Sequence, residues 1–290
     1  MTDGDGTFNV YTNMNNMKII FTYKISLMSK NTQLLYKIKS YLNIGSVSYN
    51  NKNNPNMVSY KVRNKNHLLN IIIPIFDKYP LLTSKRFNYL KFKTCLLISE
   101  DNNLSQMEKL IKINNIKNIK LMDNYMSDAW NMIIKNENIN YNTRKTMMTS
   151  SAILTLNVEN IKKIMTKSWL IGFIEAEGSF FLTQKSSNRL VHSFDISQKL
   201  DYIVLYGIKL LLNINNTIKD RKTYFKLETN NSKNIEYIMK MFMYADHKSM
   251  FLGMKSFEFK IWVRSYFKYK NDYNKLLKVR EIMMKYRKNI

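Results

Sequence analysis

Hydrophobic and polar residues alternate along several short, aromatic-rich stretches of the chain, and between these stretches apolar residues recur every three or four positions. Alternation predicts β-strands, because successive side chains of a strand point to opposite faces of a sheet. Three- and four-residue spacing predicts amphipathic helices. The predicted strands are 8–11, 18–27, 57–63, 180–183 and 190–197, with strand structure also within 217–229. The predicted helices are 33–41, 84–99, 105–113, 202–212, 256–269 and 274–288.

The same order of elements occurs twice because the chain contains an internal repeat. Asp3-Gly4-Asp5-Gly6-Thr7-Phe8 matches Glu175-Ala176-Glu177-Gly178-Ser179-Phe180, an offset of 172 residues. Further matches, such as 41–44 with 211–214, follow in the same order. Repeats at a fixed offset indicate a duplicated structural unit. The sequence therefore predicts a first copy at 1–135, a polar linker at 136–167 with a helix near 158–165, and a second copy at 168–290.

Each copy is predicted to be an α-β-β-α-β-β-α unit, so the fold class is mixed α/β. In the strand 58–63 the apolar residues take one face, while Lys61 and Arg63 take the other. One face of each sheet is expected to lie under helices, and the other face is left open.

The second copy of the acidic motif, 168–178, reads as a helix with Ser168 as its N-cap and Gly178 as its stop. Glu175 and Glu177 fall in the last turn, where the helix dipole disfavours acids by about 0.3–1 kcal/mol each. A divalent cation beyond the helix end would reverse that preference. Solvated acids would explain one such helix equally well, but recurrence in both copies indicates function.

Glycines support a special role for these motifs. Four of the chain's seven glycines fall within them, which calls for a steric reason; they are Gly4, Gly6, Gly172 and Gly178. Gly172 and Ala176 lie four residues apart on one helix face, so a second helix is expected to approach closely there.

Composition narrows the class of partner. The 290 residues include 46 Lys+Arg and 21 Asp+Glu, a formal charge of +25. Such an excess attracts polyanions, nucleic acid first, with a ribosomal or membrane-surface role as the alternative. Asn, Lys, Ile, Met, Tyr and Phe dominate the chain, which suggests an AT-rich gene such as those of organelles. One cysteine and three dispersed histidines exclude a disulfide scaffold and a local zinc motif. The apolar run at 68–76 is too short for a membrane span, so no membrane insertion is expected.

At residues 170–178 the sequence resembles the LAGLIDADG motif, read as Leu-Ile-Gly-Phe-Ile-Glu-Ala-Glu-Gly, and residues 3–6 resemble the last four positions of a first copy. The wider pattern resembles double-motif proteins encoded in introns of fungal mitochondrial genes, including 127–130, 161–181, 192–201 and 253–265. This resemblance implies two saddle-shaped antiparallel sheets, a central interface between the two motif helices, and a mitochondrial location.

The resemblance also implies the chemistry. Asp5 and Glu177, the last acids of the motifs, would bind Mg²⁺ or another divalent cation and act in phosphodiester hydrolysis. Asp3 and Glu175 are expected to be structural. By position, Lys85 and Lys255 resemble lysines that contact catalytic water or phosphate, with simple phosphate positioning as the alternative. Gln198 resembles an active-site glutamine, while the aligned residue of the first copy is Leu27.

The open sheet faces would contact double-stranded DNA at a long, nearly palindromic site. The candidate contacts are basic residues of the predicted strands and turns: Lys18, Lys24, Lys61, Arg63, Lys185, Arg189, Lys219, Arg221 and Lys226. Because two copies lie in one chain, the protein is expected to act as a monomer.

Three functions are consistent with these features. The first is a Mg²⁺-dependent, site-specific DNA endonuclease that promotes homing of its own intron. The second is an RNA maturase that assists splicing of its own mitochondrial intron, alone or in addition, in which case its partner would be a group I intron RNA. The third, a basic ribosome-associated protein, leaves the duplicated acids unexplained. Met1 falls inside the first motif, and we expect either in-frame translation from an upstream exon or a shortened first helix. The target sequence and the host gene are not encoded in these patterns.

Overall fold

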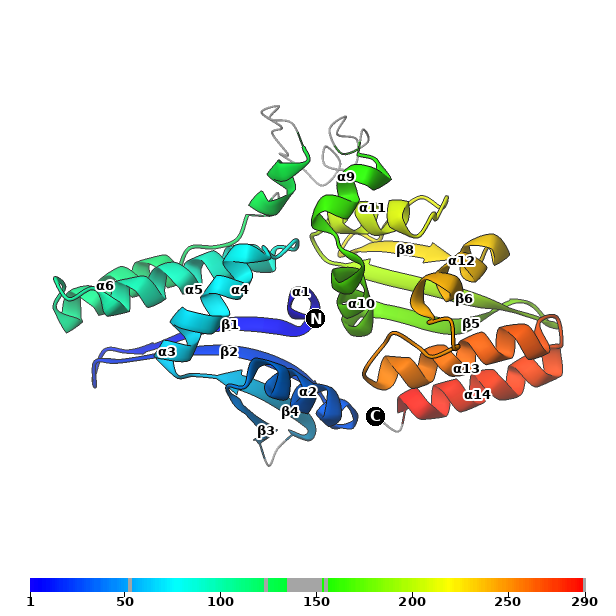
Figure 1. Cartoon of the computed structure of the whole chain (residues 1–290), viewed down its shortest axis with the longest axis horizontal. Helices are drawn as coiled ribbons and strands as arrows, with labels where there is room; N and C mark the ends of the chain where they lie inside the picture. Colours follow the sequence, from blue (N-terminus) through cyan, green and yellow to red (C-terminus); the bar gives the residue numbers. More distant parts are fainter. Residues whose placement is uncertain (52–53, 123–124, 135–152, 154–155, 289–290) are drawn as a thin grey trace. The chain divides into compact units, whose positions relative to one another are not determined.

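A computed structural model describes the chain from residue 1 to residue 290, except for 52–53, 123–124, 135–152, 154–155 and 289–290 (Figure 1). The chain divides into two compact units, residues 2–132 and residues 133–290 with Met1. Most of the predicted linker 136–167 lies outside the described residues. Its last part forms the helix α9 (Val158–Ile164), which contacts α11 (Tyr202–Leu211) of the second unit.

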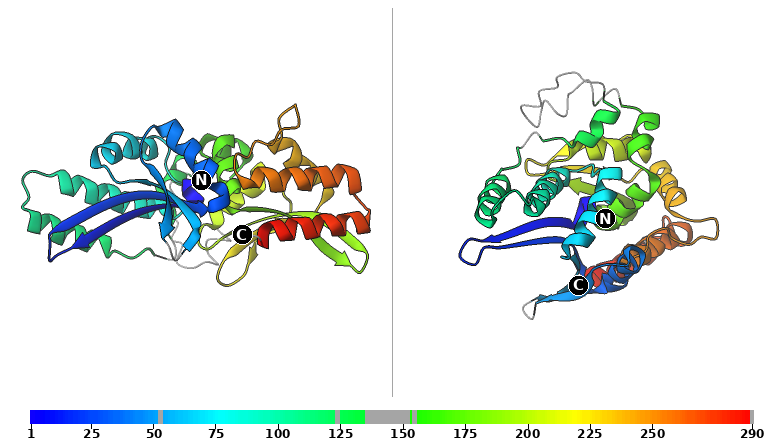
Figure 2. Two further views of the ribbon diagram at one scale, coloured as in Figure 1. Left: turned by 90° about the horizontal axis from the view of Figure 1, so that it is seen from below. Right: turned by 60° about the vertical axis from the view of Figure 1, so that its left-hand side comes forward.

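The first unit contains a four-stranded antiparallel sheet in the order β1-β2-β4-β3. β1 and β2 form a long curved hairpin (Figure 2). The Asn13 side chain accepts a hydrogen bond from the N–H of Asn15 within its turn. The strands are β1 (Gly6–Asn13), β2 (Lys18–Met28), β3 (Ser46–Asn51) and β4 (Asn54–Val62). The helical segments are α1 (Thr2–Asp5), η1 (Ser29–Asn31), α2 (Thr32–Leu42), α3 (Lys65–His67), η2 (Leu68–Ile72), α4 (Ile73–Lys78), α5 (Lys85–Glu100), α6 (Gln106–Lys117) and η3 (Asp128–Met132).

The second unit repeats this plan. Its sheet has the order β5-β6-β8-β7, which is the order of the first sheet strand for strand. The strands are β5 (Gly178–Ser186), β6 (Arg189–Gln198), β7 (Lys219–Asp220) and β8 (Phe225–Thr229). The helices, besides α9 and α11, are α10 (Lys167–Glu177), α12 (Ser232–Phe242), α13 (Met254–Tyr269) and α14 (Tyr273–Lys288). The predicted mixed α/β class with two antiparallel sheets is therefore confirmed.

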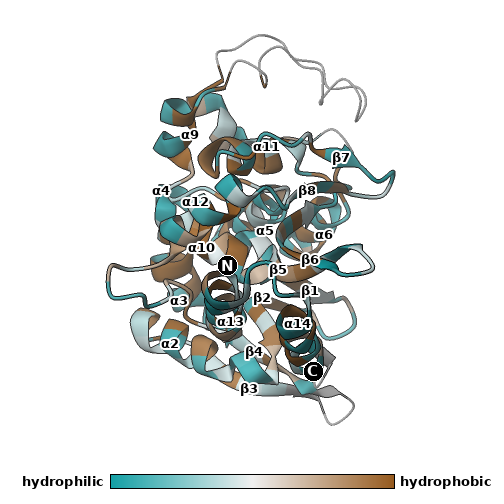
Figure 3. Ribbon diagram, turned by 90° about the vertical axis from the view of Figure 1, so that its right-hand side faces the viewer, coloured by the Kyte–Doolittle hydropathy of each residue, from teal (hydrophilic) through white to brown (hydrophobic). Residues whose placement is uncertain are grey.

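Each sheet buries one face under helices, as the alternation predicts. In β2 the side chains of Phe21, Tyr23 and Ile25 are buried. Phe21 packs against Phe92 of α5. Phe180 of β5 likewise packs against Trp262 and Phe259 of α13. Apolar residues also lie along α10 and α11 (Figure 3), and most of the residues of α11 are buried. The residues between the buried ones point to the opposite face of each sheet.

The helix after each hairpin ends in the same way. Asn43 follows α2 with a φ of 53°, and Asn213 occupies the equivalent place after α11 with a φ of 52°. Asn tolerates this left-handed conformation better than most residues, and it commonly ends helices. Ile44 and Ile214 come next and are buried in their units. The repeat seen in sequence is thus a repeat of local backbone geometry.

Two details differ from the sequence prediction. Ser168 is not the N-cap of the motif helix, because Thr166 accepts a hydrogen bond from the N–H of Trp169 and begins α10 two residues earlier. The helices α4 and α12 were not predicted. None of the helices in the described part of the chain combines the length and apolar character needed to cross a bilayer.

Candidate functional site

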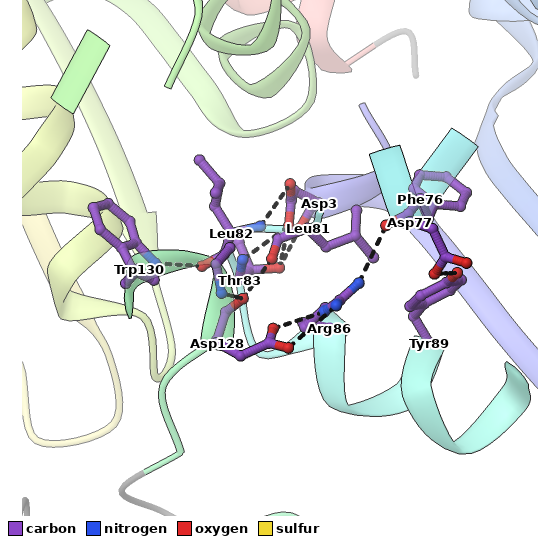
Figure 4. Close-up of polar contacts among 12 residues, drawn as sticks. Asp3, Phe76, Asp77, Leu81, Leu82, Thr83, Arg86, Tyr89, Asp128 and Trp130 are labelled. Atoms are coloured by element: carbon purple, nitrogen blue, oxygen red, sulfur yellow. Dashed lines mark hydrogen bonds and ion pairs between the residues drawn. The ribbon is translucent and has the colours of Figure 1, made fainter. Parts of the chain in front are cut away.

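The first acid of each motif holds the loop that leads into the long helix of its unit. The Asp3 carboxylate, 5% exposed, accepts hydrogen bonds from the N–H of Leu82 at 3.2 Å and of Thr83 at 2.9 Å (Figure 4). In the second unit the Glu175 carboxylate accepts hydrogen bonds from the N–H groups of Leu252 and Gly253, at 2.9 and 3.2 Å. Acceptors placed just before α5 and α13 stabilise the starts of these helices.

The two loops compensate for the different lengths of the acids. The shorter Asp3 also accepts a hydrogen bond from the Thr83 hydroxyl at 2.7 Å. The longer Glu175 instead reaches the N–H of Lys255 at 3.3 Å, and Gly253 stands where the first unit has Thr83. Burial raises the pKa of Glu175, although its backbone donors oppose the change. These contacts give Asp3 and Glu175 a structural role.

A second layer of contacts fixes the loop of the first unit (Figure 4). The Ser127 hydroxyl donates to the carbonyl of Leu81 at 2.6 Å, and the Trp130 indole donates to that of Leu82 at 2.9 Å. Arg86 pairs with both carboxylate oxygens of Asp128, at 2.7 and 3.2 Å. The segment 127–130, noted in the sequence for its resemblance, therefore anchors the loop that Asp3 holds.

The last acid of each motif lies at a junction between helix and strand. Asp5 ends α1 and Glu177 ends α10, and both residues are partly exposed. The glycine that follows begins a strand at once. A Cβ at Gly6 would lie 2.7 Å from the carbonyl oxygen of Thr2, and one at Gly178 would lie 2.9 Å from that of Ile174. Glycine is therefore required where the chain passes directly from the helix into the strand. Each acid consequently lies immediately before the first strand of its sheet.

The predicted lysines contact backbone carbonyls next to these acids. The Lys85 ammonium donates to the carbonyls of Gly4 and Gly6, the residues on either side of Asp5, with a distance of 2.7 Å to Gly6. The Lys255 ammonium donates to the carbonyl of Gly178 at 2.5 Å. In each unit the structure thus brings together the predicted acid and lysine, although their catalytic roles remain predictions.

The second unit contains further charged residues that the sequence analysis missed. Lys255 lies 3.2 Å from a carboxylate oxygen of Glu258, which is buried. Arg287 of α14 pairs with the other oxygen of Glu258 and donates to the carbonyl of Phe180 at 2.8 Å. The three-residue spacing of Lys255 and Glu258 is typical of helical ion pairs and could have indicated this contact.

Gln198 is the last residue of β6. Strand pairing places it opposite Phe225, as Leu27 is opposite Val58 in the first sheet. The two positions are therefore equivalent in structure. The Gln198 amide donates to the carbonyl of Ser197 at 2.8 Å, and its proposed part in catalysis stays a prediction.

The predicted nucleic-acid contacts lie on or beside strands, and all are at least partly exposed. In the first unit they are Lys18 and Lys24 of β2, Lys61 of β4, and Arg63 just after β4. In the second unit they are Lys185 of β5, Arg189 of β6, Lys219 of β7, Arg221 after β7, and Lys226 of β8. Gly172 and Ala176 lie on α10 and are partly exposed, and their role in helix packing stays a prediction.

The carboxylates of the two motif acids suit a hard cation. Within the described residues no three His, Cys, Asp or Glu side chains cluster in a way that could hold a metal ion. Asp5 and Glu177 each supply carboxylate oxygens, which Mg²⁺ prefers. Mg²⁺ usually binds through one or two carboxylates together with water and substrate phosphates. The donor chemistry of the two motif acids therefore fits a divalent cation that is bound together with a nucleic acid.

Comparisons with known proteins agree with the repeated unit. A family model described as LAGLIDADG endonuclease matches residues 1–96 and again residues 170–266. A Schizosaccharomyces pombe protein named "Probable intron-encoded endonuclease Cox1-I1b" is 36% identical to this chain, over 98% of the chain and 66% of that protein. A Saccharomyces cerevisiae protein named "Uncharacterized mitochondrial protein RF1" is 28% identical, over 90% of the chain and 52% of that protein. The chain thus spans between half and two thirds of these relatives.

Solved structures share the fold. The meganuclease I-SmaMI bound to uncleaveable DNA has a TM-score of 0.71 and 21% sequence identity, with 97% of this chain and 93% of that chain covered. Another structure of I-SmaMI contains an uncleaved DNA target in the presence of calcium ions. At this level of identity the comparison establishes the arrangement of helices and strands.

Proposed function

This chain belongs to the LAGLIDADG endonuclease family, and from that premise we propose that it is an intron-encoded, site-specific double-strand DNA endonuclease that promotes homing of its own intron. The observation that carries the proposal is a pair of acid and lysine that recurs at the start of the first strand of each sheet. The pairs are Asp5 with Lys85 and Glu177 with Lys255. A protein that only binds nucleic acid would not need a partly exposed carboxylate at both places.

Four groups would carry the reaction. Asp5 and Glu177 would hold Mg²⁺ or another divalent cation, which supplies an activated water and neutralises charge at the leaving oxygen. Lys85 and Lys255 are anchored to the backbone beside these acids, so their ammonium groups would orient water or a phosphate oxygen. Gln198 would assist in the second unit only, because Leu27 occupies the equivalent position in the first.

The sheets would bind the DNA. Their basic outer-face residues can neutralise phosphates and reach base edges in the major groove. Two units in one chain would let a monomer bind a long site whose halves are similar but not identical. Binding is expected to weaken steeply with salt, since each neutralised phosphate releases a counterion.

Several relatives are named probable intron-encoded endonucleases, and one relative is named a mitochondrial protein. With the composition that suggests an AT-rich organelle gene, these names support our inference of a mitochondrial location. The maturase alternative is not favoured, because several of the matching proteins are named probable intron-encoded endonucleases and RNA binding does not require the two motif acids.

The test uses purified protein, Mg²⁺ and a plasmid that carries the intronless sequence of the host gene. The wild type should cut both strands at one site, and EDTA should stop the reaction. Asp5→Asn and Glu177→Gln should each slow cleavage by more than about 100-fold, as expected when a group that stabilises developing charge is lost. DNA binding should persist in both variants.

A matched control is Glu281→Gln, which removes one exposed acid from α14. It should cut like the wild type. The proposal is wrong if the wild type leaves the plasmid intact, or if cleavage survives the double substitution at Asp5 and Glu177.

A further inference from the structure

The two sheets carry opposite charges at equivalent positions. In the first sheet Lys24 lies directly opposite Lys61 across β2 and β4. In the second sheet Asp195 lies directly opposite Glu228 across β6 and β8. Both pairs lie close to the motif glycines. Gly6 is opposite Ile25, which directly follows Lys24, and Gly178 is opposite Ile196, which directly follows Asp195.

Both pairs belong to the sheet face that points away from the helices. Tyr23 and Ile25, the neighbours of Lys24, are buried, as are Phe194 and Ile196, the neighbours of Asp195. Because side chains alternate along a strand, Lys24 and Asp195 point to the outer faces of their sheets. These are the faces that the proposed function assigns to DNA.

The first pair lies in a cationic environment. The four strands of the first sheet contain no Asp or Glu. Burial lowers the pKa of Lys61, and the charges of Arg63 and Lys24 lower it further. A bound electronegative group would relieve this repulsion. In the major groove guanine presents two such acceptors, O6 and N7, and lysine commonly contacts them.

The second pair is acidic but organised by one lysine. The Lys226 ammonium lies 2.7 Å from Oδ2 of Asp195 and 3.1 Å from Oε2 of Glu228. Burial opposes ionisation of Glu228, but its pKa is lowered because Lys226 donates a hydrogen bond to it, with Lys219 and Lys185 adding to the effect. Lys226 thus contacts one oxygen of each carboxylate, and both acidic side chains are about a fifth exposed.

Nearby phosphates repel carboxylates on a DNA-binding face, and Lys226 supplies only one positive charge for Asp195 and Glu228. A donor from the DNA would therefore stabilise these acids further. The major groove offers such a donor in the N4 amino group of cytosine, which Asp and Glu can recognise. We propose, on the basis of the proposed function, that Lys24 with Lys61 reads guanine in one half-site and Asp195 with Glu228 reads cytosine at the equivalent position of the other. The target then departs from palindromic symmetry at that position.

The experiment selects bound sequences from a randomised double-stranded DNA library, with Ca²⁺ in place of Mg²⁺. The wild type should enrich one site with guanine at one position of one strand and cytosine at the symmetry-related position of the complementary strand. One strand of that site then has guanine at both mirrored positions, whereas a palindrome would have guanine at one and cytosine at the other. Glu228→Lys should shift the cytosine preference toward guanine by about tenfold, the size of one good base contact. Lys61→Glu should cause the opposite shift in the other half-site, and all other positions should keep their preferences.

Matched controls carry the same charge changes on exposed helical residues: Glu281→Lys on α14 and Lys112→Glu on α6. They should change affinity without changing base preference. Glu228→Gln provides a milder variant if Glu228→Lys fails to fold, and it should flatten the cytosine preference.

The possible failures are distinct. If the wild type enriches no sequence, the proposed function fails and base reading fails with it. If it enriches a site that is symmetric at the mirrored positions, or if the variants lose affinity with unchanged base preferences, only the base-reading inference is overturned. The acids would then serve merely to hold Lys226.

Discussion

The ammonium nitrogen of Lys255 lies 2.5 Å from the carbonyl oxygen of Gly178, the residue that follows Glu177. Lys85 contacts Gly6, the residue that follows Asp5, at 2.7 Å. These residues are far apart in sequence, and the start of a long helix brings them together in both units. The arrangement of lysine and acid is therefore a property of the repeated unit.

The first prediction concerns these lysines. Lys85→Ala and Lys255→Ala should each slow DNA cleavage by about 10- to 100-fold, because each removes a cation from beside a motif acid. Since each unit supplies one lysine, a single variant should accumulate nicked plasmid before the linear product. Gel analysis of plasmid cleavage over time measures both effects.

Lys112→Ala, which alters an exposed lysine of α6, is the control and should cut like the wild type. A change in Kd with an unchanged cleavage rate of bound DNA would show that Lys85 and Lys255 only position phosphate.

The second prediction concerns the exit from α10. A Cβ at Gly178 would lie 2.5 Å from Cγ2 of Ile174 and 2.9 Å from its carbonyl oxygen. Gly178→Ala should therefore lower the free energy of unfolding by about 1–3 kcal/mol. Adding Ile174→Leu moves the side-chain branch away from Cβ but leaves the backbone contact, so it should restore only part of the loss. Urea denaturation of the two variants measures this; an unchanged midpoint for Gly178→Ala would contradict it.

The third prediction concerns Asp3. Its buried carboxylate accepts three hydrogen bonds from Leu82 and Thr83. Asp3→Ala should destabilise the protein by about 2–4 kcal/mol, because buried donors lose a charged acceptor. Thr83→Ala removes only the hydroxyl donor and should cost about 1 kcal/mol. Hydrogen exchange at the amides of Leu82 and Thr83 should accelerate in Asp3→Ala, and unchanged protection there would refute the assigned role.

The fourth prediction concerns His192, whose ring is buried against Trp262 and Tyr266 and lies 2.8 Å from the Ser265 hydroxyl. Burial, with help from the charge of Lys270, lowers its pKa to about 4. The unfolded chain binds the proton more tightly, with a histidine pKa of about 6.5. Stability present above that pH is therefore lost as the pH falls toward 4, by about 3 kcal/mol in all.

Urea denaturation at several pH values tests this effect of His192. His192→Gln keeps a polar side chain that does not titrate, so its stability should fall less steeply than that of the wild type between pH 7 and 4. Parallel pH profiles for the two proteins would exclude His192 as the source of the pH dependence.

Several features were predictable because they depend on local pattern. Alternation along 18–27 and 190–197 identified β2 and β6. The motif glycines were expected to have a steric reason, which the short Cβ distances at Gly6 and Gly178 provide. The start of α10 was misplaced by two residues, because Ser168 and Thr166 are both good caps and only hydrogen-bond geometry distinguishes them. The helix α12 escaped prediction although its apolar residues face the core.

By itself the sequence determined the duplication, the mixed α/β class and the identity of the motif acids, because periodicity and repetition are local properties. Only the tertiary structure decided what Asp3 and Glu175 do, since their partners lie about eighty residues away in sequence. It also decided that Lys226 is paired with Asp195 and Glu228. Strand register further showed that the Asp195–Glu228 pair of the second sheet is equivalent to the Lys24–Lys61 pair of the first. Cross-strand register places residues from distant parts of a chain side by side, and no local pattern specifies which acid will lie opposite which base.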